Sequence, residues 1–186
     1  MDAIVRAAMQ KWPNVPACYG WLGLDRRGDW YLRDANAQAM GAFQSGVPGA
    51  KGARLEHDGL RAFIERNYAS DARGCWYFQN GPQRVFVELE AAPWIVRVHA
   101  DFSLYAHDGV AVSAAGFWTD RNGWLYVETP RGLGLVHSQD VVTAVDAIEA
   151  MGWLVQDAAT TSGIATWGQR FAFVASPAAQ PPEGAT

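Results

Sequence analysis

The chain has 186 residues, of which 49% are hydrophobic and 18% are charged, and its formal net charge is −4. This composition supports a packed core, and the basic residues are spread along the chain without a cluster that would follow phosphates, so we expect no nucleic-acid partner. No apolar run approaches the length of a membrane span, and residues 1–12 lack the continuous apolar segment of a signal peptide, so we expect no membrane partner.

The first elements in chain order are a helix and a hairpin. Residues 2–12 carry apolar side chains at helical spacing, and Pro13 ends the pattern because the residue before a proline disfavours the α region. Residues 19–25 and 29–33 have the aromatic and branched composition of strands, and Gly28 lies in the turn that joins them. The sequence therefore predicts an N-terminal helix followed by an antiparallel hairpin.

A segment with many Gly and Ala residues separates this hairpin from the next helix. Residues 35–54 show little periodicity, so we expect a long loop, and long loops in compact domains are often functional. Asp58 has the residue type of an N-cap, and His57 before it is expected to cap or to pack. The apolar face of the predicted helix contains Leu60, Phe63 and Ile64.

Residues 74–98 predict a three-stranded meander, around which the rest of the chain is organised. Residues 75–79 and 84–90 are strand-like, and Asn80-Gly81-Pro82-Gln83 supplies the turn between them. Pro93 cannot donate a hydrogen bond to a neighbouring strand, so the chain leaves the hairpin there and forms a third strand from Trp94.

The second half of the chain predicts further strands around one helix. We expect strands over residues 97–105, 116–118, 124–128, 153–156 and 164–174. A helix is expected from Ser138, its N-cap, to Gly152. Residues 176–186 contain three prolines and no large apolar residue, so we expect a disordered tail.

The order of elements repeats within the chain. The hairpins at residues 24–34 and 118–129 both combine Asp and Arg in a turn with Gly and an aromatic strand. After an intervening segment, each is followed by an apolar run that ends in a histidine, His57 or His137, and then by a helix. We therefore predict an α+β fold with two small domains of similar fold, residues 1–93 and 94–175, each with antiparallel strands packed on one helix.

Several segments resemble a known family. They are LGLDRRGDWYLRD, the Arg-Leu-x-His start of the first domain's helix, and GCWYFQNGPQRVFVELEAAPW, whose corner consists of Glu88, Glu90, Ala92, Pro93 and Trp94. Residues 165–171 are similar to the family's final strand. From residue 21 to residue 173 the chain resembles the bacterial family called domain of unknown function 1285. This resemblance implies two small α+β domains of similar fold with a ligand site between them and a sensing or signalling role, and it implies no known reaction.

Some polar residues have types that can carry chemistry. The residues that offer nitrogen and oxygen ligands to a metal are His99, Asp101, His107 and Asp108. Turn residues of these types are usually solvated, so we predict no metal site. Glu88 and Glu90 lie two residues apart on a strand, which suits an acid/base pair and equally suits a solvated sheet face. Gly132-Leu133-Gly134 precedes a helix whose first turn contains Asp140, and that charge disfavours a bound phosphate.

The residues that we select as a ligand site are aromatic or basic. They are Trp94, Arg97, Trp118, Arg131, His137, Trp167 and Arg170. A cleft lined by Trp and Arg commonly holds a small anionic or planar ligand by stacking and by bidentate hydrogen bonding. Tryptophans in small sheets more often belong to the core, and that alternative stays open.

The sequence leaves three functions open. We favour a cytoplasmic, non-enzymatic module that binds a small ligand or a protein partner between its two domains, with no cofactor and no catalytic residue. Cys18 and Cys75 lack a disulfide or metal spacing, which fits free thiols in a reducing compartment. The alternatives are a hydrolase that uses the Glu88 and Glu90 pair or a His/Asp metal site, and a homodimer whose tryptophans form the subunit contact.

Overall fold

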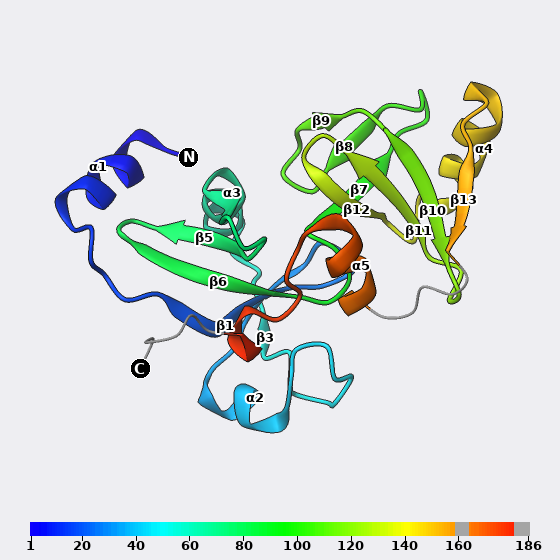
Figure 1. The fold of residues 1–186 in the computed structure, drawn as a ribbon. Coiled ribbons are helices and arrows are strands. Elements are labelled where there is room, and N and C mark those ends of the chain that lie inside the picture. Colours follow the sequence, from blue (N-terminus) through cyan, green and yellow to red (C-terminus); the bar gives the residue numbers. More distant parts are fainter. Residues whose placement is uncertain (159–163, 181–186) are drawn as a thin grey trace. The chain divides into compact units, whose positions relative to one another are not determined.

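The computed structural model describes residues 1–158 and 164–180, and it divides the chain into two compact units (Figure 1). The first unit holds residues 1–25, 29–90 and the chain from residue 172 onward, and the second holds residues 26–28 and 91–171. Each unit has its own β-sheet with helices, so the expected α+β class is confirmed. In the described ranges, no helix has the length and apolar character needed to cross a membrane.

The first unit is built on a six-stranded sheet. Its elements are α1 (Ala3–Lys11), β1 (Cys18–Leu24), β2 (Trp30–Leu32), α2 (Ala35–Met40), β3 (Ala53–Arg54), α3 (Asp58–Arg66), β4 (Tyr68–Ser70), β5 (Trp76–Asn80), β6 (Gln83–Leu89) and the short 3₁₀ helix η1 (Pro177–Ala179). The strand order is β3-β2-β1-β6-β5-β4. Strands β1 and β6 are parallel and the other neighbours are antiparallel, so the expectation of antiparallel strands alone is wrong for this sheet.

Side-chain caps explain where two helices of this unit begin. The carboxylate of Asp34 accepts the N–H of Ala37, and the helix α2 that it caps occupies the start of the segment expected to be a loop. At α3 the cap is not Asp58 but His57, whose Nδ1 atom accepts the N–H of Leu60 at 3.1 Å. Asp58 therefore lies in the first turn of α3, where its negative charge interacts favourably with the positive end of the helix dipole.

Both faces of the first sheet are covered, because neighbouring residues of a strand point to opposite sides. On one face the ring of Phe78 lies edge-on to Phe63 of α3, with centroids 5.4 Å apart. On the other face Phe86 stacks on Tyr19 with centroids 4.6 Å apart and belongs to a cluster with the buried Cys75. The first unit therefore has an apolar layer on each side of its sheet.

The end of the chain returns to the first unit. Val174 pairs with Cys75, the carbonyl oxygen of Ala175 accepts the N–H of Leu89, and the hydroxyl of Ser176 donates to the buried carboxylate of Glu88. The predicted second domain extends to residue 175, whereas in the structure the chain from residue 172 belongs to the first unit. The disorder expected from residue 176 is wrong for residues 176–180, where Pro177 is buried in η1, and residues 181–186 lie outside the described ranges.

The second unit is built on a seven-stranded sheet. Its elements are β7 (Trp94–Val98), β8 (Leu104–Ala106), β9 (Ala111–Val112), β10 (Gly116–Asp120), β11 (Leu125–Thr129), β12 (Gly132–Val136), α4 (Val141–Met151), β13 (Val155–Ala158) and α5 (Ile164–Phe171). The strand order is β13-β10-β11-β12-β7-β8-β9. Two pairs, β12 with β7 and β10 with β13, are parallel, so this sheet is also mixed.

Two adjacent residues of β10 show how the second sheet is covered. Phe117 stacks on Trp153, which follows α4, with centroids 5.2 Å apart. Trp118 points to the opposite face and meets Phe171 of α5 at 5.9 Å. The strand expected over residues 164–174 is therefore wrong, because the first part of this segment is helix α5. Trp167 and Phe171 are four residues apart and stack on one face of this helix.

The ends of α4 test two expectations about its caps. The residue before its first turn is Asp140, so the expected N-cap at Ser138 is wrong. Gly152 follows the last turn with φ of +64°, in the left-handed conformation that was expected to end the helix.

The six strands of the first sheet and six of the seven strands of the second share one topology, to which the second sheet adds β13. In each, the first strand pairs antiparallel with the second and parallel with the last strand of a meander, giving β3-β2-β1-β6-β5-β4 and the equivalent β9-β8-β7-β12-β11-β10. The similar fold of the two domains is thus present, but the predicted equivalence of hairpins is wrong. The β1–β2 hairpin corresponds to β7–β8, and the hairpin of residues 118–129 corresponds to β4–β5. Along the chain α3 precedes β4, whereas α4 follows β12, so the two helices do not correspond to each other.

Candidate functional site

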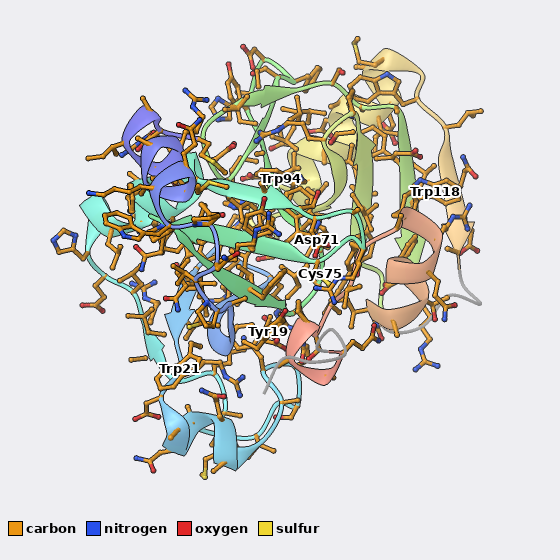
Figure 2. All side chains as sticks on the ribbon, turned by 60° about the vertical axis from the view of Figure 1, so that its left-hand side comes forward. Tyr19, Trp21, Asp71, Cys75, Trp94 and Trp118 are labelled. Atoms are coloured by element: carbon orange, nitrogen blue, oxygen red, sulfur yellow. The ribbon has the colours of Figure 1, made fainter. Side chains whose placement is uncertain are left out.

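The first unit contains an apolar groove with a volume of about 880 Å³. Its buried floor consists of Leu22, Ile64 and Phe78, with the partly buried Val85 beside them. Its rim consists of Trp21, Leu32, Met40 and Leu60, whose exposed fractions are 51%, 45%, 55% and 36%. Single exposed apolar side chains are common on protein surfaces, whereas a group of four around one hollow is of the kind often found at binding surfaces. Figure 2 labels Trp21 on β1.

Strand β1 is irregular next to the position where it contributes Trp21 and Leu22 to the groove. The pairing of β1 with β6 shifts register between Cys18 and Leu22, and Gly20 in this stretch has φ of +77°, which a residue with a side chain rarely adopts. Strict alternation would send Trp21 and Leu22 to opposite faces of the sheet. With the irregularity, both of them line the groove.

A buried arginine joins the groove to the segment that follows β2. The guanidinium of Arg33 donates to the carbonyl oxygens of Ala50 at 2.8 Å, Gly20 at 3.2 Å, Ala37 at 3.4 Å and Gly41 at 2.6 Å. Burial lowers the pKa of Arg33, and its Coulomb interaction with Glu88 opposes that shift. Arg33 lines the groove and ties α2 and the following loop to β1.

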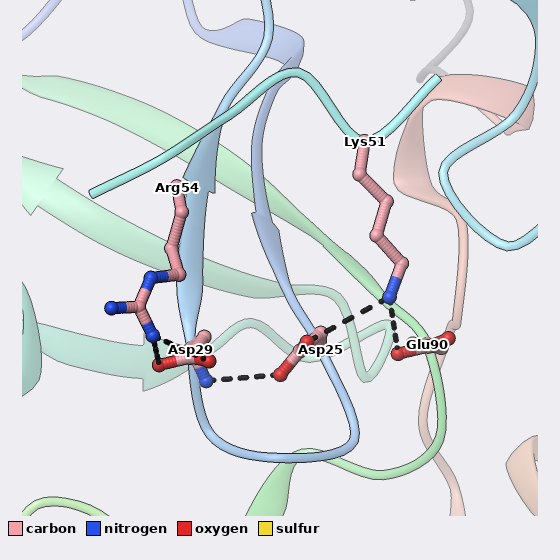
Figure 3. A network of polar contacts seen from close by, with 5 residues as sticks. All are labelled: Asp25, Asp29, Lys51, Arg54 and Glu90. Atoms are coloured by element: carbon pink, nitrogen blue, oxygen red, sulfur yellow. Dashed lines mark hydrogen bonds and ion pairs between the residues drawn. The ribbon is translucent and has the colours of Figure 1, made fainter. Parts of the chain in front are cut away.

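A second polar network holds the far end of that loop (Figure 3). The Nζ atom of Lys51 lies 2.8 Å from Glu90 and 3.7 Å from the buried carboxylate of Asp25. Asp25 accepts the N–H of Asp29, which in turn pairs with Arg54 at 3.1 Å. Because Gly49, Gly52 and Ala53 of this loop line the groove, the network fixes one of its walls.

The residues selected from the sequence all lie in the second unit, where Trp94 and Arg131 form the first of three groups. The guanidinium carbon of Arg131 lies 3.9 Å from the ring centre of Trp94, and its nitrogens bind the carboxylate of Asp108. The ring of His107 lies 5.1 Å from that of Trp94, and its Nδ1 atom accepts the N–H of Ile95. Burial lowers the pKa of His107 to about 4, so the imidazole is neutral at pH 7.

Two further selected residues, Arg97 and His137, share a neighbour. The carboxylate of Asp140 accepts hydrogen bonds from the guanidinium of Arg97 and from the N–H of Val98, the latter at 3.1 Å. Although burial raises the pKa of Asp140, these hydrogen bonds hold it below the usual value, and the charge of His137 acts in the same direction. This group fastens the start of α4 to β7.

The last three selected residues lie where α5 packs on the second sheet, with Trp167 and Arg170 in α5 and Trp118 in β10. The guanidinium carbon of Arg170 lies 3.7 Å from the ring centre of Trp118, and Trp167 lies 4.6 Å from Tyr126. Trp94, Trp118 and Trp167 are buried, with exposed fractions of 2%, 7% and 1% (Trp94 and Trp118 are labelled in Figure 2). The structure thus brings the seven residues together in three groups, and their role in ligand binding stays a prediction.

The residues considered for metal or acid/base chemistry are engaged elsewhere. Among the described residues, no group of three or more His, Cys, Asp or Glu side chains could hold a metal. Glu88 is buried and accepts the N–H of Ala178, while Glu90 pairs with Lys51. The two carboxylates therefore form neither an open pair nor the solvated face that was the alternative. Gly134 lies in β12, where an added Cβ would come within 2.5 Å of Val96, so that glycine permits a close strand approach.

The groove residues were missed by sequence reasoning. The long segment after the first hairpin was expected to be functional, and part of it lines the groove. The other lining residues, such as Leu22 of β1 and Leu60 of α3, lie in other elements, and no pattern in the sequence connects them. The signal that could have found them is an excess of apolar residues on both sides of the β1–β2 hairpin, since a half-exposed hairpin alternates polar and apolar positions.

Comparison with known proteins gives families without a described activity. The model of the family DUF2944, described as "Protein of unknown function (DUF2946)", matches residues 1–179. No curated protein matches the chain. Among solved structures, the chain is similar to the crystal structure of a DUF1285 family protein from Silicibacter pomeroyi DSS-3, with a TM-score of 0.47 and 14% identity over 78% of this chain and 84% of that chain. The expected resemblance to DUF1285 is confirmed, whereas the matching family model is that of a different family.

Proposed function

Because the chain belongs to the DUF2944 family, whose description names no activity, we propose from its own residues that it is a non-catalytic module that binds a small, largely apolar ligand. The observation that carries this proposal is the groove of the first unit, with its volume of about 880 Å³ and four exposed apolar side chains around it. Pockets of about 300–1,000 Å³ with mostly apolar walls and a few polar groups are typical of small-molecule sites.

The proposed role is to sense or carry that ligand in the cytoplasm. The free thiols of Cys18 and Cys75 support a reducing compartment. A binding role also fits the polar contacts of the groove, because Arg33 and Lys51 hold its walls in place. A preformed site loses little conformational entropy when its ligand binds.

Titration with the neutral hydrophobic probe N-phenyl-1-naphthylamine tests this proposal. We expect a saturable rise in probe fluorescence and a loss of affinity of about tenfold or more in Ala53→Trp, which fills the groove from the exposed strand β3. The matched control is Ala111→Trp, because Ala111 is an exposed alanine in the equivalent two-residue strand β9 of the other sheet. Absence of saturable binding, or equal losses in both variants, contradicts the proposal.

A homodimer is the second candidate, and one observation favours it. Large apolar side chains are exposed on α4, on the edge strand β13 and just before that strand, with exposed fractions of 74% for Val142, 41% for Val155 and 84% for Leu154. Exposed apolar surface at a sheet edge favours self-association. Light scattering of the native chain and of Leu154→Lys tests it, with Val110→Lys as the control for an exposed apolar residue elsewhere in the same unit. A monomeric native chain excludes the dimer.

A further inference from the structure

The buried arginine of the groove forms no ion pair with any described residue, although its charge interacts at longer range with the buried carboxylate of Glu88. Arg33 is 4% exposed, and its hydrogen bonds go to four backbone carbonyl oxygens, which are neutral acceptors. Among the ion pairs of the described residues, none includes Arg33. A guanidinium has five N–H groups, so one N–H of Nη1 remains beyond these four bonds.

Two charges line the groove, and they differ in burial. Asp34 is exposed, and its carboxylate caps α2 by accepting the N–H of Ala37. Water and salt screen an exposed charge strongly, whereas a buried charge acts through a lower effective dielectric constant. Of the two charges that line the groove, that of Arg33 is therefore the less screened, and Glu88, the buried carboxylate that interacts with it, does not line the groove. Asn36 and Asn80 add amide groups to the same lining, which can bind an anionic head group without repelling it.

We propose that the ligand is an amphipathic anion, an alkyl or aryl chain that ends in a carboxylate. This inference rests on the proposed binding function and names the chemistry of its ligand. The apolar chain occupies the floor formed by Leu22, Ile64 and Phe78, and the carboxylate accepts a hydrogen bond from Arg33. Charge-assisted hydrogen bonds of this kind supply orientation as well as affinity.

A series of ligands with one chain and three head groups tests the inference by calorimetry at pH 7. We expect decanoate to bind the native chain at least about tenfold more tightly than 1-decanol, a factor that corresponds to about 1.4 kcal/mol, and decylamine to bind more weakly than 1-decanol. Equal affinities for decanoate and 1-decanol overturn the inference and leave the apolar groove as a site. Tightest binding of decylamine overturns it as well. Failure of all three ligands and of the neutral probe removes the proposed function itself.

Three variants locate the effect without changing the arginine, and Ala111→Trp is the control among them. Ala53→Trp is expected to abolish decanoate binding, and Ala111→Trp is expected to preserve it, so retained binding in Ala53→Trp places the ligand elsewhere and overturns the inference. Asp34→Asn removes the charge at the rim, while asparagine caps a helix as well as aspartate does. We expect it to tighten the binding of decanoate by about two- to threefold more than that of 1-decanol. Equal changes for both ligands contradict the role of charge.

Discussion

Trp94 and Arg131 hold each other by two contacts at once. The indole N–H of Trp94 donates to the carbonyl oxygen of Arg131 at 2.8 Å, and the guanidinium of Arg131 lies over the same indole ring at 3.9 Å. The guanidinium also forms a bidentate pair with Asp108. This arrangement fastens the turn before β12 to the start of β7.

Removing this guanidinium is expected to destabilise the second unit. Arg131→Met takes away the partner of the buried Asp108 carboxylate and the cation above Trp94, so we expect the free energy of unfolding to fall by about 2 kcal/mol. Urea unfolding measures it. The control is Arg121→Met in an exposed turn, with an expected change of less than about 0.5 kcal/mol. Similar losses in the two variants mean that the Trp94–Arg131 pair is energetically unimportant.

Gly23 of β1 is expected to tolerate no side chain. An added Cβ would lie 2.4 Å from the ring of Phe43, so Gly23→Ala forces that buried ring to move and costs about 1–3 kcal/mol. Gly116→Ala is the control, because its Cβ would meet its nearest neighbours at 3.6 Å, an ordinary contact. In a Phe43→Ala background the cost of Gly23→Ala should largely disappear, and thermal unfolding of the four chains checks this. An undiminished cost would show that the clash with Phe43 is not its cause.

Stability is expected to depend on pH through His107. Burial lowers its pKa from 6.5 to about 4, so between these values the unfolded chain binds more protons than the folded chain. The free energy of unfolding therefore falls as the pH falls from 6.5 toward 4, by up to about 3 kcal/mol, and this contribution is fully present above pH 6.5. In His107→Asn, urea unfolding at a series of pH values should show a flatter dependence in this window. An unchanged slope assigns the dependence to other groups.

A substitution near the end of the chain is expected to weaken the first unit and not the second. Phe173 is buried and belongs to the first unit, so Phe173→Ala removes about 3 kcal/mol or more of packing there. Hydrogen exchange measured strand by strand should show faster exchange in β5 and β6 than in β11 and β12. Phe117→Ala, in the core of the second unit, should reverse this pattern. Loss of protection in both units from Phe173→Ala contradicts the division of the chain.

Local signals predicted much of the fold. The turn at Gly81-Pro82, the break at Pro93 and the end of α4 at Gly152 depend on backbone preferences of the residues themselves, and each lies where the sequence places it. The parallel pair of β1 and β6 joins residues such as Leu22 and Val87, which are far apart in the chain. No local pattern reports such a pairing, which explains why both sheets were expected to be antiparallel.

The α5 segment and the groove show two other limits of sequence reasoning. Trp167 and Phe171 are aromatic, which favoured a strand, but their spacing of four residues places them on one helix face. The groove lies beside an irregularity near Gly20 and includes a charged residue whose burial is visible only in three dimensions. Arg33 carries no signal in the sequence that separates it from the other arginines.

The return of the last residues to the first sheet sets the order in which the protein can be completed during translation. Chains emerge from the ribosome with the N-terminus first, so the whole second unit has left the tunnel before Val174 and Ser176 can reach Cys75 and Glu88. The first unit, although most of it is made before the second, is therefore finished after it. A premature stop codon anywhere in the second unit leaves a nascent product that is defective in both halves.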